Sequence, residues 1–148
     1  MPRVMQRLRR NKFSWGKNMT MACMIGGEVM TAGPIDICKM PPRGVPNPFM
    51  NIGTWLMCVD FVPMVLINSS PSCNTGTIIP ESNGDQAGTM GGVISGTFML
   101  LVTPLTGAFN VLIDGLPANN LGMTVTLSND TNTMGIYSVP SQTDVIAL

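Results

Sequence analysis

The chain of 148 residues contains no histidine, and only 11% of its residues are charged. The first absence removes the usual proton shuttle, the histidine-based catalytic triads and the commonest metal ligand. The second is unusual because about 25% of the residues of an ordinary soluble domain are charged. We therefore expect that the chain is not an enzyme. We also expect it to hide much of its surface in a partner, an assembly or a membrane.

Basic residues are absent from most of the chain, since no lysine or arginine follows Arg43. Six of the eight basic residues lie within residues 1–17, although the net charge of the whole chain is zero. We therefore predict a basic N-terminal extension, residues 1–17, followed by one mildly acidic domain over residues 18–148. The extension can contact nucleic acid, an acidic protein surface or a membrane, or it can be a disordered solubilising tail.

Helical periodicity is also missing, because no ten residues after residue 17 follow a clean 3.6-residue pattern. Short runs of β-branched and apolar residues are instead interrupted by 16 glycines and 12 prolines. Four of the prolines lie in residues 41–49, where they exclude a helix or a central strand. The pair Asp114-Gly115 is a strong hairpin signal, and a second turn is predicted at Asn129-Asp130. The fold class predicted is all-β, with short strands and tight turns.

Residues 91–113, GGVISGTFMLLVTPLTGAFNVLI, are uncharged and long enough to span a bilayer as a helix. A membrane-inserted protein is therefore one alternative. Pro104, the glycines and the many threonines and valines fit strands better than a helix. We predict two strands here, with a turn near residues 103–107.

The stretch GDQAGTMGGVISGT, residues 84–97, is rich in glycine. It is not a nucleotide loop, because it lacks a GKS or GKT ending and no lysine follows residue 39 to reach a phosphate. The strand and helix of a dinucleotide-binding fold are missing as well. We interpret Asp85 as a turn residue that accepts backbone N–H groups. The glycines are expected to give positive φ angles and close backbone approach at tight corners: Gly84, Gly88, Gly91, Gly92 and Gly96.

The four cysteines are Cys23, Cys38, Cys58 and Cys73, and they lack the paired C-x2-C spacing of a typical zinc site. Three interpretations stay open. The cysteines are buried thiols that act as small apolar side chains, or they form two disulfides of a secreted protein, or a subset of them binds a tetrahedral zinc ion.

Two segments together resemble the PAAR-like family. The run IDICKMPPRGVPNPFMNIG (35–53) is similar to the family's opening motif, in which Asp-x-Cys-Lys precedes a proline-rich segment that ends in an aromatic residue, Asn-Ile and a small residue. Residues 84–97 are similar to its second motif, Gly-Asp-Glu-Ala-Gly-Thr-x-Gly-Gly-Val-x-Ser-Gly. The run AFNVLIDGLPANNL (108–121) fits its closing strand, turn and strand. The resemblance covers about residues 20–122.

The resemblance implies a small β pyramid that caps and sharpens the trimeric β-helical spike of a contractile injection machine. Such machines include type VI secretion systems, phage-like tails and extracellular injection particles. One copy would bind the valine-glycine-repeat end of each spike, carry or recruit an effector, and contact the target membrane during injection, with no nucleic-acid partner. The protein would be cytoplasmic during assembly and then extracellular or inside the target cell.

A second alternative is the N-terminal targeting part of a secreted toxin. Only about 25 residues follow the resemblance, too few for an independent catalytic domain.

Relatives of this kind hold a metal near the apex through histidine and cysteine. Since this chain has no histidine, the resemblance makes Cys38 the first candidate ligand of a zinc ion, with Cys23, Cys58 and Cys73 as further candidates. The segment FMLLVTPL (98–105) is apolar where the family is usually charged. We therefore expect a deeper core or a covered partner surface at this segment.

Overall fold

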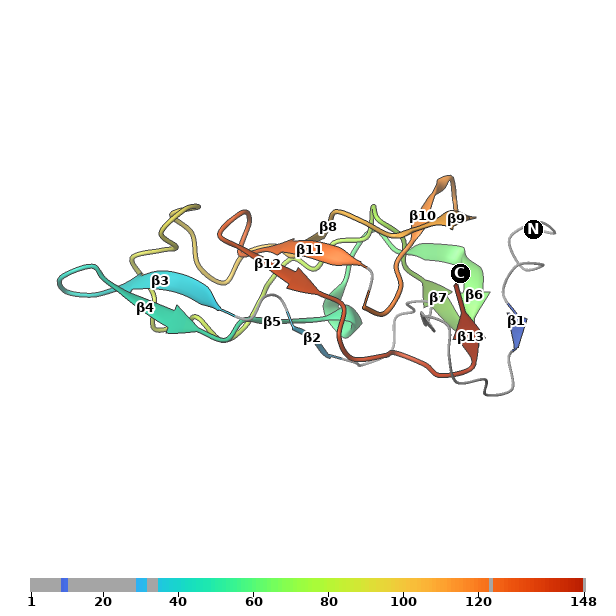
Figure 1. Cartoon of the computed structure of the whole chain (residues 1–148), viewed down its shortest axis with the longest axis horizontal. Coiled ribbons are helices and arrows are strands. Elements are labelled where there is room, and N and C mark those ends of the chain that lie inside the picture. The colour runs from blue at the N-terminus through green and yellow to red at the C-terminus, as the bar shows by residue number, and fades with distance from the viewer. Residues whose placement is uncertain (1–8, 11–28, 32–34, 123, 148) are drawn as a thin grey trace.

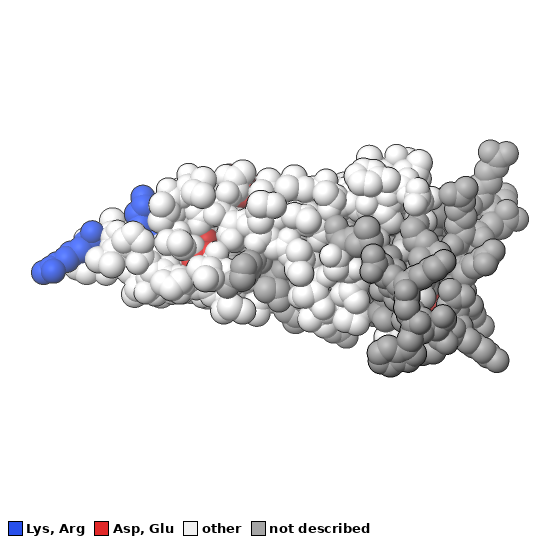
Figure 2. Space-filling model, viewed as in Figure 1, with Lys and Arg blue, Asp and Glu red and all other residues white. Residues whose placement is uncertain are grey.

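A computed structural model describes residues 9–10, 29–31, 35–122 and 124–147. The molecule is elongated, and it tapers from a wide end to a narrow end formed by a single hairpin (Figure 1, Figure 2). Nearly all regular structure in these residues is β, which confirms the predicted all-β class; the exception is one turn of 3-10 helix, η1 (Trp55–Met57).

The strands are short, and we give their bounds in chain order. They are β1 (Arg9–Arg10), β2 (Val29–Thr31), β3 (Asp36–Met40), β4 (Val45–Phe49), β5 (Ile52–Thr54), β6 (Val62–Ile67), β7 (Ser70–Ser72), β8 (Thr103–Pro104), β9 (Ala108–Ile113), β10 (Leu116–Ala118), β11 (Val125–Ser128), β12 (Thr133–Ile136) and β13 (Val145–Ile146).

These strands form several small antiparallel sheets rather than one large sheet. Five sheets have two strands, with the pairs β1–β13, β2–β5, β3–β4, β6–β7 and β9–β10, and one has three strands in the order β12–β11–β8. Glycine and proline interrupt the chain too often for longer strands to form. The narrow end is the β3–β4 hairpin, and the wide end holds β6, β7, β9, β10 and β13 (Figure 1).

Both predicted turns are present. Asp114 and Gly115 join β9 to β10 with φ angles of +52° and +81°, as a two-residue type I′ turn requires. Asn129 and Asp130, with φ angles of +49° and +60°, begin the connection from β11 to β12. Asn, Asp and Gly adopt these positive φ values more easily than other residues, which is why the sequence pattern was informative.

Residues 91–113 contain the two expected strands, β8 and β9, with residues 105–107 between them. The first strand is only two residues long, since residues 91–101 form irregular loops and Pro104 has no N–H to extend a ladder. Among the residues that the structure describes, we find no helix of the length and apolar character that a bilayer crossing needs.

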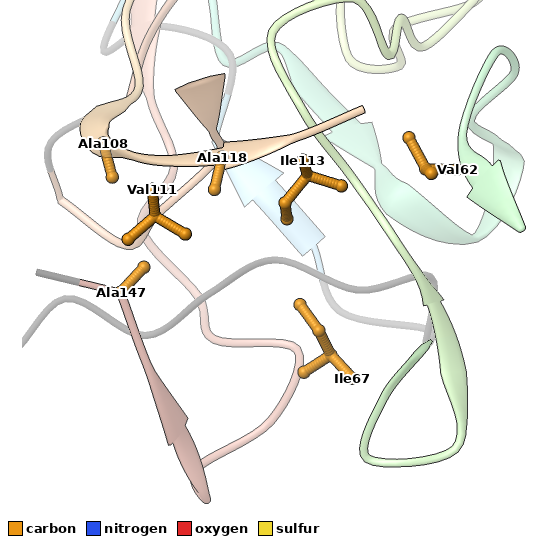
Figure 3. Packing of buried hydrophobic residues seen from close by; sticks show 7 residues of the cluster. All are labelled: Val62, Ile67, Ala108, Val111, Ile113, Ala118 and Ala147. Atoms are coloured by element: carbon orange, nitrogen blue, oxygen red, sulfur yellow. The ribbon is translucent and has the colours of Figure 1, made fainter. Parts of the chain in front are cut away.

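Two apolar clusters form the core. The central one packs the ring of Trp55 edge-on against Tyr137, with ring centroids 5.9 Å apart, and the other members are Cys58, Cys73, Ile79 and Val102. The second cluster brings together β6, β9, β10 and the residue after β13 (Figure 3), all of which lie in the wide half of the molecule (Figure 1). Its members are Val62, Ile67, Ala108, Val111, Ile113, Ala118 and Ala147.

The interior of the narrower half is polar instead. On β11, Thr126 and Ser128 are fully buried, whereas Val125 and Leu127 are partly exposed. The alternating pattern of this strand therefore turns its polar face inward. Small hydroxyl and amide side chains fit this thin section, where larger apolar side chains would not pack.

Candidate functional site

The candidate site lies near the narrow end and begins with β3. Asp36 and Cys38 are two positions apart on this strand, so both point to the same face, and both are fully buried. Ile37, between them, points outward and is exposed. Pairing of Cys38 with Asn47 in the β3–β4 ladder fixes the position of the thiol within the hairpin.

The glycine-rich loop lies against the other edge of β3. The N–H of Lys39 donates to the carbonyl of Gly91 at 2.9 Å, and the N–H of Met90 donates to the carbonyl of Lys39 at 3.2 Å. Further along, the N–H of Val93 donates to the carbonyl of Ile37 at 3.0 Å. The two sequence motifs, far apart in the chain, therefore form one unit of structure.

The five glycines of this loop have two different roles. Gly84, Gly91 and Gly96 have positive φ angles of +135°, +84° and +74°. Gly88 and Gly92 have ordinary φ angles but no free space. A Cβ on Gly88 would overlap Cys38, and a Cβ on Gly92 would overlap the Asn132 side chain. Glycine is needed at 88 and 92 because other atoms already fill the room a side chain would take.

The same loop brings Asp85 to Cys38. The Sγ of Cys38 lies 3.6 Å from Asp36 Oδ1 and 3.7 Å from Asp85 Oδ2, and the three candidate ligand atoms are within 4.8 Å of one another. Asp85 is fully buried and accepts the N–H of Met99 at 3.1 Å. Met99 has a φ of +53°, an uncommon conformation for a long side chain. The prediction that Asp85 accepts a backbone N–H is confirmed by Met99, and its carboxylate also contacts Cys38, 47 positions away, which the turn interpretation did not include.

Three buried asparagines surround the Asp36 carboxylate, and the sequence analysis missed all three. Asn51 donates to Asp36 Oδ2 at 2.7 Å and Asn129 donates to the same oxygen at 3.1 Å, while Asn132 donates to Oδ1. Asn129 also donates to the carbonyl of Thr97 at 2.8 Å. The sequence indicated Asn129 only as part of a turn, and no motif or residue spacing relates it to Asp36.

The electrostatics of the site favour the protonated forms of Cys38 and Asp85. Burial, together with the negative charges of Asp36 and Asp85, raises the pKa of the Cys38 thiol to about 12. Burial also raises the pKa of Asp85, and the charge of Asp36 adds to this, although the N–H of Met99 opposes it. No lysine or arginine of the described chain pairs with these groups. The site therefore gathers two carboxylates and a thiol without a compensating positive side chain.

This donor set fits a divalent metal ion. For a tetrahedral zinc with Zn–S near 2.3 Å and Zn–O near 2.0 Å, the sulfur and oxygen ligands are about 3.5 Å apart. The two S···O separations here, 3.6 and 3.7 Å, are close to that value. In addition, the buried Oδ1 of Asn51, whose amide holds Asp36, has no hydrogen-bond partner among the described residues. Asp36, Cys38 and Asp85 are thus the residues that would hold the ion.

The other cysteines do not join this group. Cys58 and Cys73 lie in the central apolar cluster, where the hydrogen bond between the Cys58 thiol and Cys73, together with burial, raises the pKa of the Cys58 thiol. None of Cys38, Cys58 and Cys73 forms a disulfide in the described chain. Cys23 lies outside the described residues. Of the predicted cysteine ligands, Cys38 alone is found in a metal-capable cluster, and its neighbours there are aspartates.

Comparison with known proteins gives one match. The family model described as the toxin PAAR-like domain matches residues 29–135, which include both sequence motifs and also Asn129 and Asn132. No curated protein and no solved structure gives a significant match to the chain. The matched region covers well over half of the sequence and contains the whole buried cluster around Cys38, so the chain belongs to the toxin PAAR-like domain family.

Proposed function

We propose that this protein is a structural tip that caps the end of a trimeric β-helical spike in a contractile injection system. Membership of the toxin PAAR-like domain family supports a spike-tip or toxin-associated role. The observation that carries the more specific proposal is the contrast between the two ends. One end is a thin hairpin, and the other is broader (Figure 1) and carries exposed apolar side chains on β6, β9 and β10.

The wide end supports this proposal through its exposed apolar side chains. Phe109 on β9 is 72% exposed and Met64 on β6 is 71% exposed. Three more exposed apolar residues lie on β6, β9 and β10: Leu66, Leu112 and Leu116. Apolar side chains that gather on one surface are typical of interaction sites. Contact with a partner would remove this surface from water and would stabilise the complex through the hydrophobic effect.

Free strand edges support the same contact. The wide-end sheets β6–β7 and β9–β10 have two described strands each, so β6, β7 and β9 pair with a described strand on one edge only, whereas residues 73–75 also bridge the other edge of β10. An unpaired edge offers a row of N–H and C=O groups that another strand can bind. The end of a β-helix has the same unsatisfied groups, so a contact between the two would satisfy both.

Co-purification with the spike tests this proposal. We expect Phe109→Asp combined with Met64→Asp to reduce recovery with the trimeric spike at least tenfold, because two charges would be buried in an apolar contact. The control is Ile94→Asp, which changes an equally exposed side chain (75%) of the narrow half. The β-type circular dichroism spectrum should be unchanged in both variants. Equal recovery of all three proteins, or no spike with the unmodified chain, contradicts the proposal.

We further propose that a zinc ion, held by Asp36, Cys38 and Asp85, fixes the glycine-rich loop to β3 near the apex. Bound zinc, with two positive charges, would offset two of the three negative charges of the carboxylates and the thiolate. Since Cys38 must lose its proton to bind, the affinity for zinc should rise with pH.

Metal analysis and thermal unfolding of the full chain test the zinc proposal. We expect one zinc per chain and a higher melting temperature on zinc addition. Cys38→Ser and Asp85→Asn should each abolish this increase. Asp114→Asn, which neutralises an exposed aspartate of the β9–β10 turn, is the control and should keep it. A melting temperature that does not respond to zinc in the unmodified protein contradicts the proposal.

A further inference from the structure

The positive side chains of the domain body gather at its narrow end. Between residues 35 and 147, the described cations are Lys39 and Arg43, and both belong to the β3–β4 hairpin. Figure 2 shows them at the point of the molecule, while the visible acidic groups lie behind it. Neither cation forms an ion pair with a described carboxylate, and Arg43 is exposed in the turn over residues 41–44. Their charges are therefore available to a partner.

Apolar side chains lie directly beside these charges. Val45, which pairs with Met40 at the end of the hairpin, is 57% exposed. Met90 is 46% exposed, and its Cε would lie 3.4 Å from a Cβ placed on Gly44, so it packs against the turn. The point of the molecule is thus a small convex surface with two cations and an apolar rim.

This surface is held rigidly before any partner arrives. Five residue pairs form the β3–β4 ladder, and the N–H of Gly44 donates to the carbonyl of Met40 at 2.8 Å to close the turn. On the other edge of β3, the bonds between Lys39 and residues 90 and 91 attach the glycine-rich loop. A contact made by such a surface loses little conformational entropy.

The chemistry that fits this surface is that of an anionic lipid bilayer. Lysine and arginine bind lipid phosphates, and their attraction to an anionic leaflet is worth about fivefold in affinity for each cation. Exposed valine and methionine can enter the boundary between headgroups and acyl chains. A free phosphate ion is a poorer match, because two cations on a convex tip do not enclose it.

We propose that the narrow end is a lipid-contact surface, in which Lys39 and Arg43 bind the phosphates of anionic phospholipids while Val45 and Met90 enter the headgroup region. This contact lies at the end opposite the proposed spike surface. The lipid contact does not depend on spike binding, so an experiment can support or contradict either proposal without affecting the other.

The experiment must detect lipid contact at the narrow end specifically, because residues 1–17 carry six further cations and can bind vesicles on their own. We therefore place a tryptophan at the tip with Val45→Trp in the full chain. Quenching of its fluorescence by vesicles of brominated phosphatidylglycerol reports contact at that position. The matched control is Met64→Trp, at an exposed position of the wide end, and the signal of the unmodified chain, from Trp15 and Trp55, is subtracted.

We expect brominated phosphatidylglycerol vesicles to quench the tip tryptophan strongly and the control tryptophan weakly, with little effect of brominated phosphatidylcholine. Adding Lys39→Gln and Arg43→Gln to Val45→Trp should weaken the vesicle affinity reported by quenching about 30-fold. Arg43→Gln alone, in the exposed turn, should weaken it about fivefold, and it provides the test if the double change disturbs the hairpin. Equal quenching at both tryptophans, equal quenching by both lipids, or no effect of removing the cations would overturn the proposal.

Discussion

Gly92 shows, at the scale of single residues, how little space surrounds the buried cluster. Its φ angle is ordinary, so its backbone conformation would accept any residue. Its neighbour is the Asn132 side chain, which accepts the N–H groups of Ile94 and Ser95 at 2.8 and 3.2 Å and donates to Asp36. A methyl group at residue 92 would displace the asparagine that holds both the loop and the carboxylate.

We therefore predict that Gly92→Ala destabilises the protein by about 3 kcal/mol or more, because overpacking and lost hydrogen bonds act together. The matched control is Gly96→Ala in the same loop. Gly96 has a positive φ of +74° but no atom within 4 Å of a new Cβ, so we expect a cost of only about 1 kcal/mol. Urea unfolding measures both changes. A Gly92→Ala variant as stable as Gly96→Ala would contradict the packing described here.

A second prediction concerns the charge of Asp85. Its pKa in the folded protein is raised above the ordinary value of 3.8, chiefly by burial. Its contribution to stability is therefore most favourable below about pH 3.8, and it is lost as the pH rises through the folded-state pKa. In the presence of a chelator, Asp85→Asn should be more stable than the unmodified protein at pH 7, because it removes a buried charge beside Asp36.

Urea unfolding as a function of pH checks this prediction. The advantage of Asp85→Asn should shrink as the pH falls through the raised pKa of Asp85, because the unmodified carboxyl then becomes protonated as well. Saturating zinc at pH 7 should reverse the order, since the unmodified protein alone would keep the ligand. A variant that is less stable than the unmodified protein under chelating conditions would mean that the carboxylate is stabilised by contacts other than those seen here.

The sequence indicated the residues of this site only where they are close to one another along the chain. Asp36 and Cys38 are neighbours on one strand, and the Asp-x-Cys-Lys motif drew attention to Cys38. Asp85 approaches Cys38 from 47 positions away, and Asn132 approaches Asp36 from 96 positions away. Contacts of this kind depend on how separate hairpins pack, which neither spacing nor composition specifies.

At the scale of elements, the β11–β12 connection acts as a clamp on the narrow half. Asn129 and Asn132 extend from this connection to the Asp36 carboxylate on β3. Thr133 at the start of β12 donates to the carbonyl of Ile35 at 2.8 Å. Three side chains of one hairpin therefore hold the strand that carries the candidate metal ligands.

We predict that Asn132→Ala destabilises the chain by about 2–4 kcal/mol, because it removes bonds to a buried carboxylate and leaves two backbone N–H groups of the glycine-rich loop without an acceptor. Thr131→Ala, one residue earlier and exposed, should change stability by less than about 0.5 kcal/mol. Chemical denaturation measures both. Equal effects of the two substitutions would show that the clamp does not stabilise the fold.

Elements whose conformation is specified by neighbouring residues could be predicted from the sequence. Features that depend on packing between distant segments could not. Asp114-Gly115 specifies a two-residue turn by its own conformational preferences, so the β9–β10 hairpin follows from the sequence. The inward direction of Thr126 and Ser128 does not follow, because alternation of polar and apolar residues defines two faces without saying which is buried. Apolar burial is the usual outcome, and on this strand the polar side chains are buried instead, although the hydroxyls of Thr126 and Ser128 have no hydrogen-bond partner among the described residues.

At the scale of the whole molecule, the two ends differ in charge. Exposed apolar side chains occur at both ends, whereas the described cations of residues 35–147, Lys39 and Arg43, lie on the hairpin of the narrow end. A tip with this polarity would be oriented by chemistry as well as by shape, with one end suited to a protein partner and the other to a lipid surface.

The polar interior has a thermal consequence. Among the described residues, about as many polar as apolar side chains are buried. Exposure of polar surface lowers the heat capacity of unfolding, whereas exposure of apolar surface raises it. Calorimetry should therefore give a heat-capacity change per residue below the usual 12–15 cal/mol/K, roughly, and an ordinary value would contradict this. A smaller change flattens the curve of stability against temperature, so a wedge built around amides and hydroxyls would hold its shape almost equally well in cold and in warm surroundings.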